Sequence, residues 1–84
     1  MDYKKAFEVI STYVDLSVNT SMSEQTRTDA HYCAYWFKQV IDYGVNDRST
    51  PRYIQRITEC EVSRRYGMIR FLSENNYIHS LPTM

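Results

Sequence analysis

Few side chains in this sequence could carry out catalytic chemistry. Apart from carboxylates, the candidates are His31, Cys33, Cys60 and His79. A nucleophile needs a base beside it, and a metal ion needs three or four ligands. His31 and Cys33 are two residues apart in a predicted helix, so they point to different faces and cannot grip one metal together. Gly-rich phosphate loops, His-Glu-x-x-His and Cys-x-x-Cys are all missing from the sequence. We therefore expect a protein that is not an enzyme and that uses neither metal nor cofactor.

Aromatic residues offer binding chemistry instead. The chain contains eight Tyr, three Phe and one Trp among 84 residues, more than a small core can bury. Four of them lie mostly off the apolar stripe of one predicted helix: Tyr32, Tyr35, Trp36 and Tyr43. Tyr and Trp are enriched where proteins bind one another, as is Arg. Either flanking helices cover this second face, or it binds a partner, and the sequence leaves both readings open.

Basic residues gather in the second half of the chain. Residues 1–47 carry net charge −3 and residues 48–84 carry +3, so the total is zero. The segment around Val62-Ser63-Arg64-Arg65 has the pattern of a DNA-recognition helix followed by a wing, although its turn lacks a glycine. The arginines that would face nucleic acid are Arg52, Arg56, Arg64, Arg65 and Arg70. An ordinary solvated helix face explains the same residues equally well.

Two helices must position the aromatic residues. Asp2 is placed to cap a first helix over residues 3–18, in which Tyr3, Phe7, Ile10, Val14 and Val18 share one face. A capping box over Ser21-Met22-Ser23-Glu24 predicts a second helix over residues 22–43. Gly44 follows this second helix and is suited to end it.

A third helix is predicted over residues 51–74. Thr50 is the expected N-cap, and Pro51 stands at the first helical position, where its missing N–H costs nothing. The sequence reads either as one long helix, favoured by the lack of Gly and Pro between Arg52 and Tyr66, or as two helices meeting near residues 61–63. Asn75-Asn76 should end it, Tyr77-Ile78 should fold back on the core, and residues 78–84 should form a loose tail.

These elements predict one all-α domain over residues 1–84, a small three-helix hairpin or bundle. Only two Gly and two Pro are present, too few for the many turns of a β-sandwich or barrel. Seven residues are expected to form the core: Phe7, Ile10, Val14, Phe37, Ile41, Ile57 and Leu72. Two cysteines do not make a disulfide framework, and no signal peptide or membrane span is visible, so we expect a cytoplasmic protein.

For function, the sequence favours a non-enzymatic binding protein that docks on another protein through the aromatic residues and nearby arginines, and modulates or inhibits it. The alternative is a small helix-turn-helix or winged-helix regulator of transcription that binds DNA. A third reading is a protein that sequesters a nucleotide between Tyr rings and Arg side chains. We expect no membrane partner. A homodimer that buries the second aromatic face would suit so small a core.

Overall fold

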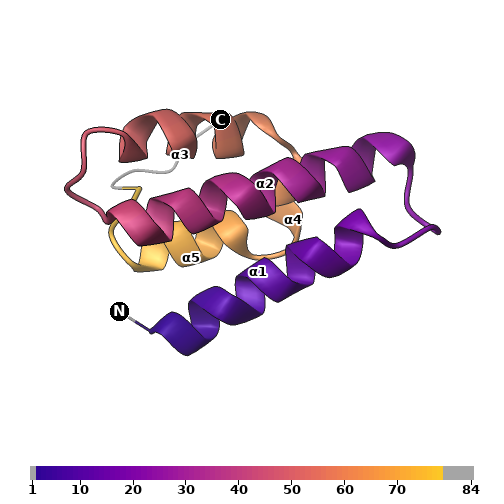
Figure 1. Ribbon diagram of the computed structural model, residues 1–84, viewed down its shortest axis with the longest axis horizontal. Coiled ribbons are helices and arrows are strands. Elements are labelled where there is room, and N and C mark those ends of the chain that lie inside the picture. The colour runs from indigo at the N-terminus through magenta and orange to yellow at the C-terminus, as the bar shows by residue number, and fades with distance from the viewer. Residues whose placement is uncertain (1, 79–84) are drawn as a thin grey trace.

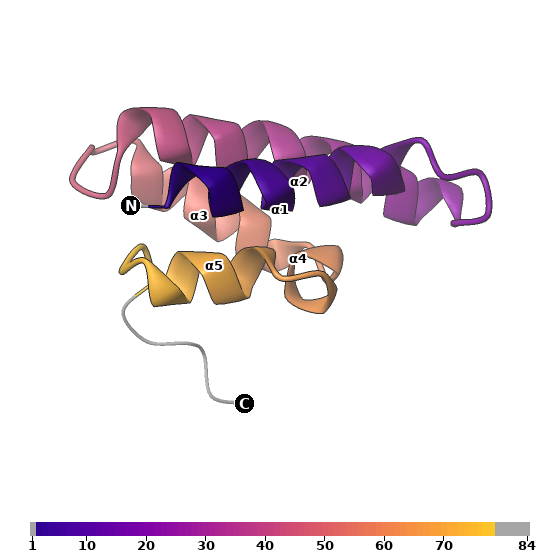
Figure 2. The same cartoon turned by 90° about the horizontal axis from the view of Figure 1, so that it is seen from below.

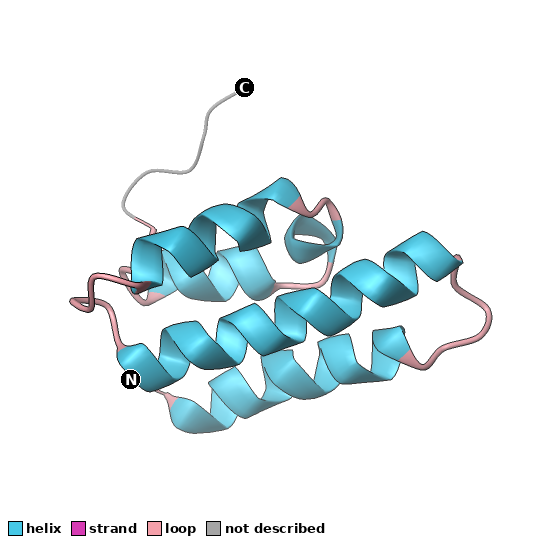
Figure 3. Cartoon of the chain, turned by 45° about the horizontal axis from the view of Figure 1, so that its top comes forward, coloured by secondary structure: helices cyan, strands magenta, loops and turns pink. Residues whose placement is uncertain are grey.

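A computed structural model describes residues 2–78 of the chain. Within this range the chain forms helices and no strand: α1 (Tyr3–Ser17), α2 (Glu24–Tyr43), α3 (Thr50–Glu59), α4 (Val62–Arg65) and α5 (Met68–Glu74). All five are visible in Figure 1, and Figure 3 shows that only loops connect them. The all-α class predicted from the sequence is therefore confirmed.

The helices pack around an α1–α2 hairpin. α1 and α2 run antiparallel and contact each other along their lengths, and α3 lies along the side of α2 that faces away from α1 (Figure 1). The short helices α4 and α5 lie together on one side of the hairpin, as Figure 2 shows. The opposite side of the hairpin has no helix of the described chain over it.

The start of α1 agrees with the sequence, whereas the start of α2 does not. The Asp2 carboxylate accepts a hydrogen bond from the Lys5 backbone N–H at 3.1 Å, as a helix cap should. The predicted capping box at Ser21 is wrong, because the Ser21 hydroxyl donates to the Asn19 side chain at 2.6 Å. Ser23 caps α2 instead, so α2 begins two residues later than predicted.

Gly44 ends α2 as expected, with a φ of +92° that residues with a Cβ rarely adopt. Thr50, however, is not the cap of α3. It is the first residue of that helix, it is buried, and its hydroxyl donates to the Gly44 carbonyl at 2.6 Å. This hydrogen bond joins the two ends of the loop between α2 and α3. α3 therefore begins at Thr50, one residue before the predicted first residue, Pro51.

The single helix predicted over residues 51–74 is wrong, because this segment is broken twice. At Cys60 the backbone becomes extended, with φ −94° and ψ 118°, which separates α3 from α4 near the position of the predicted split. Gly67, with φ +99°, separates α4 from α5. Each break turns apolar residues toward the hairpin, so that Val62 and Met68 are both buried. The split alternative is therefore right about a break near residues 61–63, but it predicted two helices where the structure has three.

The first helix is rotated relative to the prediction. Phe7 and Val14, both predicted core residues, are 67% and 46% exposed. The buried face of α1 consists of Ala6, Val9, Tyr13 and Leu16. Both sets of residues have helical spacing, so the spacing alone does not decide which set is buried.

The rest of the predicted core is largely confirmed. Phe37, Ile57 and Leu72 are fully buried, and the Phe37 ring meets the Phe71 ring edge-on at 5.4 Å. Ile10 and Ile41 are only partly buried, packed against the core. These side chains join α2, α3 and α5 in one apolar interior.

Tyr13 fastens the short helices to α1. Its buried hydroxyl donates to the Val62 carbonyl at 2.8 Å and accepts from the Met68 N–H at 3.4 Å. Burial raises the pKa of this phenol far above its usual value, so the hydroxyl stays protonated and can donate. One side chain thus satisfies backbone groups on both sides of the Gly67 break.

The end of the described chain folds back as predicted. Asn76 has a φ of +66°, which terminates the helical pattern after α5. Tyr77 is buried and Ile78 is packed against the core. Residues 79–84 of the predicted loose tail lie outside the described residues.

Candidate functional site

Three of the potential catalytic residues lie in the described part of the chain: His31, Cys33 and Cys60. Within residues 2–78 no three His, Cys, Asp or Glu side chains lie close enough to hold a metal ion. Cys33 is buried, and burial together with its neighbour Cys60 raises the pKa of the Cys33 thiol. Burial also raises the pKa of the Cys60 thiol, which is hydrogen-bonded to Cys33. Both thiols therefore stay protonated as part of the core, His31 lies exposed against the Tyr32 ring, and His79 lies outside the described residues.

Three of the four predicted binding aromatics take part in one surface, which we call the ring ladder. It consists of Tyr32, Trp36 and Tyr43 from α2 and Tyr53 and Arg56 from α3. The α2 members are spaced by four and seven residues, which places them on one helix face. Because α3 packs along this face, its side chains interleave with those of α2.

At one end of the ring ladder, Tyr32 stacks on Trp36. The ring centroids are 5.6 Å apart and the planes differ by 28°. The Arg56 guanidinium lies 5.9 Å from the Trp36 ring centroid, a cation–π arrangement. Tyr32 is 48% exposed and Trp36 is partly buried, so the stack has one end anchored in the fold and one end in solvent.

At the other end, Tyr43 stacks on Tyr53. The two rings are nearly parallel, at an angle of 11°, and their centroids are 6.0 Å apart. Sequence reasoning missed Tyr53. Tyr53 lies three residues before Arg56 in α3, so the two residues share a helix face. That spacing is the sequence feature from which Tyr53 could have been predicted.

Tyr35, the fourth predicted residue, lies outside the ring ladder. It follows Ala34 and precedes Trp36 on α2, so its side chain points about 100° away from that of Trp36. It is 53% exposed, and its ring contacts no other ring in the described part of the chain. The structure therefore does not bring Tyr35 together with the other three.

The exposed face of α3 adds positive charge to the ring ladder. Arg52 and Arg56 stand one turn apart on α3 and are exposed. Neither forms an ion pair with any described residue. Both guanidinium groups are therefore open to acidic groups on another molecule.

The five arginines predicted to face nucleic acid do not share one helix. Arg52 and Arg56 belong to α3, Arg64 and Arg65 to α4, and Arg70 to α5. Arg65 pairs with Glu61, and the Arg70 guanidinium lies 3.5 Å from the Glu74 carboxylate. α4 has only four residues, too few to present several side chains along a DNA groove.

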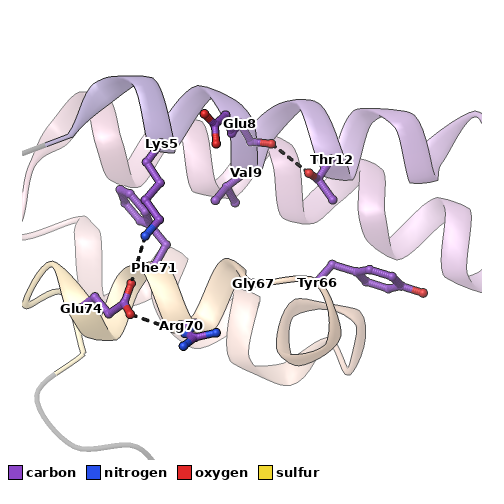
Figure 4. Close-up of a pocket in the computed structure, with 9 residues that line it drawn as sticks. All are labelled: Lys5, Glu8, Val9, Thr12, Tyr66, Gly67, Arg70, Phe71 and Glu74. Atoms are coloured by element: carbon purple, nitrogen blue, oxygen red, sulfur yellow. Dashed lines mark hydrogen bonds and ion pairs between the residues drawn. The ribbon is translucent and has the colours of Figure 1, made fainter.

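A hollow of about 420 Å³ lies between α1 and α5 (Figure 4). The Glu74 carboxylate is shared by two cations, Lys5 at 3.7 Å and Arg70 at 3.5 Å. These groups are exposed and already paired, and Thr12 donates its hydroxyl to the Glu8 backbone carbonyl at 2.9 Å. The Lys5, Arg70 and Glu74 charges of this hollow are therefore paired with one another, whereas the Glu8 carboxylate in its lining forms no ion pair among the described residues.

Comparison with protein-family models, with curated proteins and with solved structures finds no match to this chain. None of the helices in residues 2–78 has the length and apolar character needed to cross a bilayer. The ring ladder is thus the described surface whose geometry bears most directly on function.

Proposed function

We propose that this protein is a non-enzymatic binding protein that docks on another protein through the ring ladder and thereby modulates or inhibits it. The observation that carries the proposal is the presence of two stacked ring pairs on α2 and α3, Tyr32–Trp36 with the Arg56 guanidinium and Tyr43–Tyr53, in which Tyr32 and Tyr43 remain half-exposed. Cytoplasmic localisation belongs to the same proposal.

The stacking lowers the cost of binding. Immobilising a flexible side chain in an interface costs about 0.5–1.5 kcal/mol. In the ring ladder Tyr32 and Tyr43 are already held against Trp36 and Tyr53, so much of this ordering is present before a partner arrives. Each aromatic side chain also offers a large apolar area together with a polar edge. Such preordered rings suit the centre of a protein interface.

The charge of α3 suggests the character of the partner. Arg52 and Arg56 are exposed on α3, and neither forms an ion pair within the described chain. Arg56 is also oriented by the Trp36 ring, which leaves its N–H groups available for a carboxylate. The partner should therefore present acidic side chains around an apolar patch.

DNA binding receives less support. It would require several arginines on one element that enters a groove, whereas the candidates are divided among three short helices. Arg65 and Arg70 each have an acidic partner four residues away, which reduces the positive field they offer to phosphates. This alternative is separated from protein docking by the following experiment.

The test is capture from a nuclease-treated lysate of the native host with the tagged protein, read by mass spectrometry. A protein should be retained in stoichiometric amount, and Trp36→Ala should weaken its binding about 30-fold, since a binding hot spot contributes about 2 kcal/mol or more. Tyr35→Ala is the matched control, because this exposed ring on the same helix lies outside the ring ladder. It should change binding less than about 3-fold.

Two outcomes would contradict the proposal. Material that is mainly nucleic acid and that disappears with nuclease would favour the DNA-binding alternative, which should also show steep weakening with salt. If Trp36→Ala abolishes cooperative unfolding in urea, then Trp36 is a core residue of the fold and the interpretation of the ring ladder as an interface fails.

A further inference from the structure

The outer face of α1 is apolar and is exposed among the described residues. Tyr3, Phe7, Val14 and Val18 are exposed there, at up to 70% for Val18, and Ile10 between them is partly buried. We call these five residues the α1 stripe. Within α1 the spacing of four, three and four residues keeps Tyr3, Phe7, Ile10 and Val14 in one band, about 110° around the helix from the buried face, and Val18 follows directly after the helix as its C-cap residue. α4 and α5 lie together on one side of the hairpin (Figure 2), and the exposure of Tyr3, Phe7, Val14 and Val18 shows that no described helix covers these side chains.

We propose that the α1 stripe is the contact surface of a homodimer, in which the α1 helices of two copies pack antiparallel about a two-fold axis. Such an interface uses the same patch on both copies and must be complementary to itself. The α1 stripe meets this requirement in shape and in charge. It is a different surface from the second aromatic face of α2, on which the sequence placed a dimer contact.

The shape of the α1 stripe favours antiparallel packing. Its large rings, Tyr3 and Phe7, stand at the N-terminal end, and its smaller side chains, Val14 and Val18, stand at the C-terminal end. With Ile10 near the two-fold axis, antiparallel helices place each ring opposite a valine of the second copy. A parallel pair would instead place ring against ring and valine against valine, which leaves gaps between the valines.

Charge favours the same arrangement. Lys4 and Asp15 are eleven residues apart, close to three helical turns, so both stand along the same edge of the α1 stripe. Neither forms an ion pair within the described part of the chain. Antiparallel packing brings Lys4 of each copy beside Asp15 of the second copy, whereas parallel packing does not bring these opposite charges to the same level along the axis.

The size of the α1 stripe sets the strength of the dimer. With aromatic side chains of about 150–250 Å² each, Tyr3 and Phe7 expose roughly 250 Å² per copy. With the valines, two copies bury on the order of 800–1,000 Å², slightly below the range of about 1,200–2,000 Å² for stable specific complexes. The dimer should therefore be weak and depend on concentration, with a monomer that folds by itself.

The test is sedimentation equilibrium of the full chain from 1 μM to 1 mM, on the order of the range in which weak dimers dissociate. The unmodified chain should dimerise reversibly, and Phe7→Glu should weaken the dimer at least about 10-fold, because a charge would be buried against an apolar surface. Val45→Glu is the matched control, since Val45 is an exposed apolar residue outside both surfaces. It should leave the dimer unchanged, and Val18→Glu is a second variant in case Phe7→Glu unfolds.

A charge swap tests the antiparallel geometry itself. Lys4→Asp and Asp15→Lys should each weaken the dimer, and the two changes together should restore it, because the opposite charges would again face one another. A chain that stays monomeric up to 1 mM would overturn the proposal. A dimer that is insensitive to Phe7→Glu and Val18→Glu would also overturn it, because the contact surface would then lie elsewhere. A monomer that binds lipid vesicles through Phe7 would overturn it as well, because the α1 stripe would then bind lipid.

Discussion

The ring ladder and the α1 stripe are both exposed and both contain aromatic residues, but their rings are held differently. In the ring ladder, Tyr32 rests on Trp36 and Tyr43 rests on Tyr53, so each exposed ring has a partner within the fold. In the α1 stripe, the Phe7 ring contacts no other ring among residues 2–78 and is 67% exposed. The number of exposed aromatic residues therefore does not by itself show how a surface binds a partner.

The difference indicates two kinds of binding. Rings that are held in place, beside unpaired arginines, suit recognition of one partner with a defined arrangement of acidic and apolar groups. A stripe of unsupported apolar side chains gains free energy mainly from removal of apolar area from water. Since the α1 stripe is complementary to itself, a second copy of the chain can cover it without any other partner.

The largest expected effect separates the two faces of α1. Leu16 is almost fully buried, and Leu16→Ala should lower the free energy of unfolding by about 2–5 kcal/mol. Val14 is exposed in the α1 stripe, and Val14→Ala should change the free energy of unfolding by no more than about 0.5 kcal/mol. Urea unfolding at a concentration that keeps the chain monomeric measures both. Equal losses would mean that the outer face is covered.

A smaller effect is expected at Tyr13, on the buried face. Tyr13→Phe removes the hydroxyl that serves the Val62 carbonyl and the Met68 N–H, and leaves these buried groups unpaired. The cost should be about 1–3 kcal/mol in urea unfolding. Tyr43→Phe, which removes a hydroxyl from an exposed ring, should cost less than about 0.5 kcal/mol. A neutral Tyr13→Phe would show that the hydroxyl does not fasten α4 and α5.

The smallest effect concerns the cation–π pair of the ring ladder. A double-mutant cycle of Arg56→Gln and Trp36→Leu should give a coupling energy of about 0.5–1 kcal/mol, the usual value for an exposed pair. The matched cycle with Arg52→Gln should give a value near zero, because no ring contact of Arg52 occurs in the described chain. Similar coupling for both arginines would mean that the ring ladder does not hold Arg56.

The helix ends that depend on local chemistry could be predicted from the sequence. Asp2 and Gly44 were identified because a carboxylate before a helix and a glycine after one act on their own backbone neighbourhood. The break at Cys60 was predicted only as an alternative, near residues 61–63, since no Gly or Pro marks it. It follows from the packing of α4 against the hairpin, which is a tertiary effect.

Local sequence patterns also could not predict the rotation of α1 or the full set of residues in the ring ladder. Two apolar bands of α1 have helical spacing, and only the fit of Tyr13 between α4 and α5 selects which one is buried. Three ring-ladder residues on α2 were predicted from their position off the apolar stripe. Tyr53 was missed because its role arises only when α3 lies beside α2.

The most direct test of the two-surface interpretation is to measure partner capture and self-association in the same pair of variants. We predict that Trp36→Ala reduces capture about 30-fold and leaves dimerisation intact. We predict that Phe7→Glu weakens dimerisation at least about 10-fold and leaves capture intact. If either single substitution removes both activities while the chain remains folded, the two surfaces are not independent, and the interpretation is contradicted.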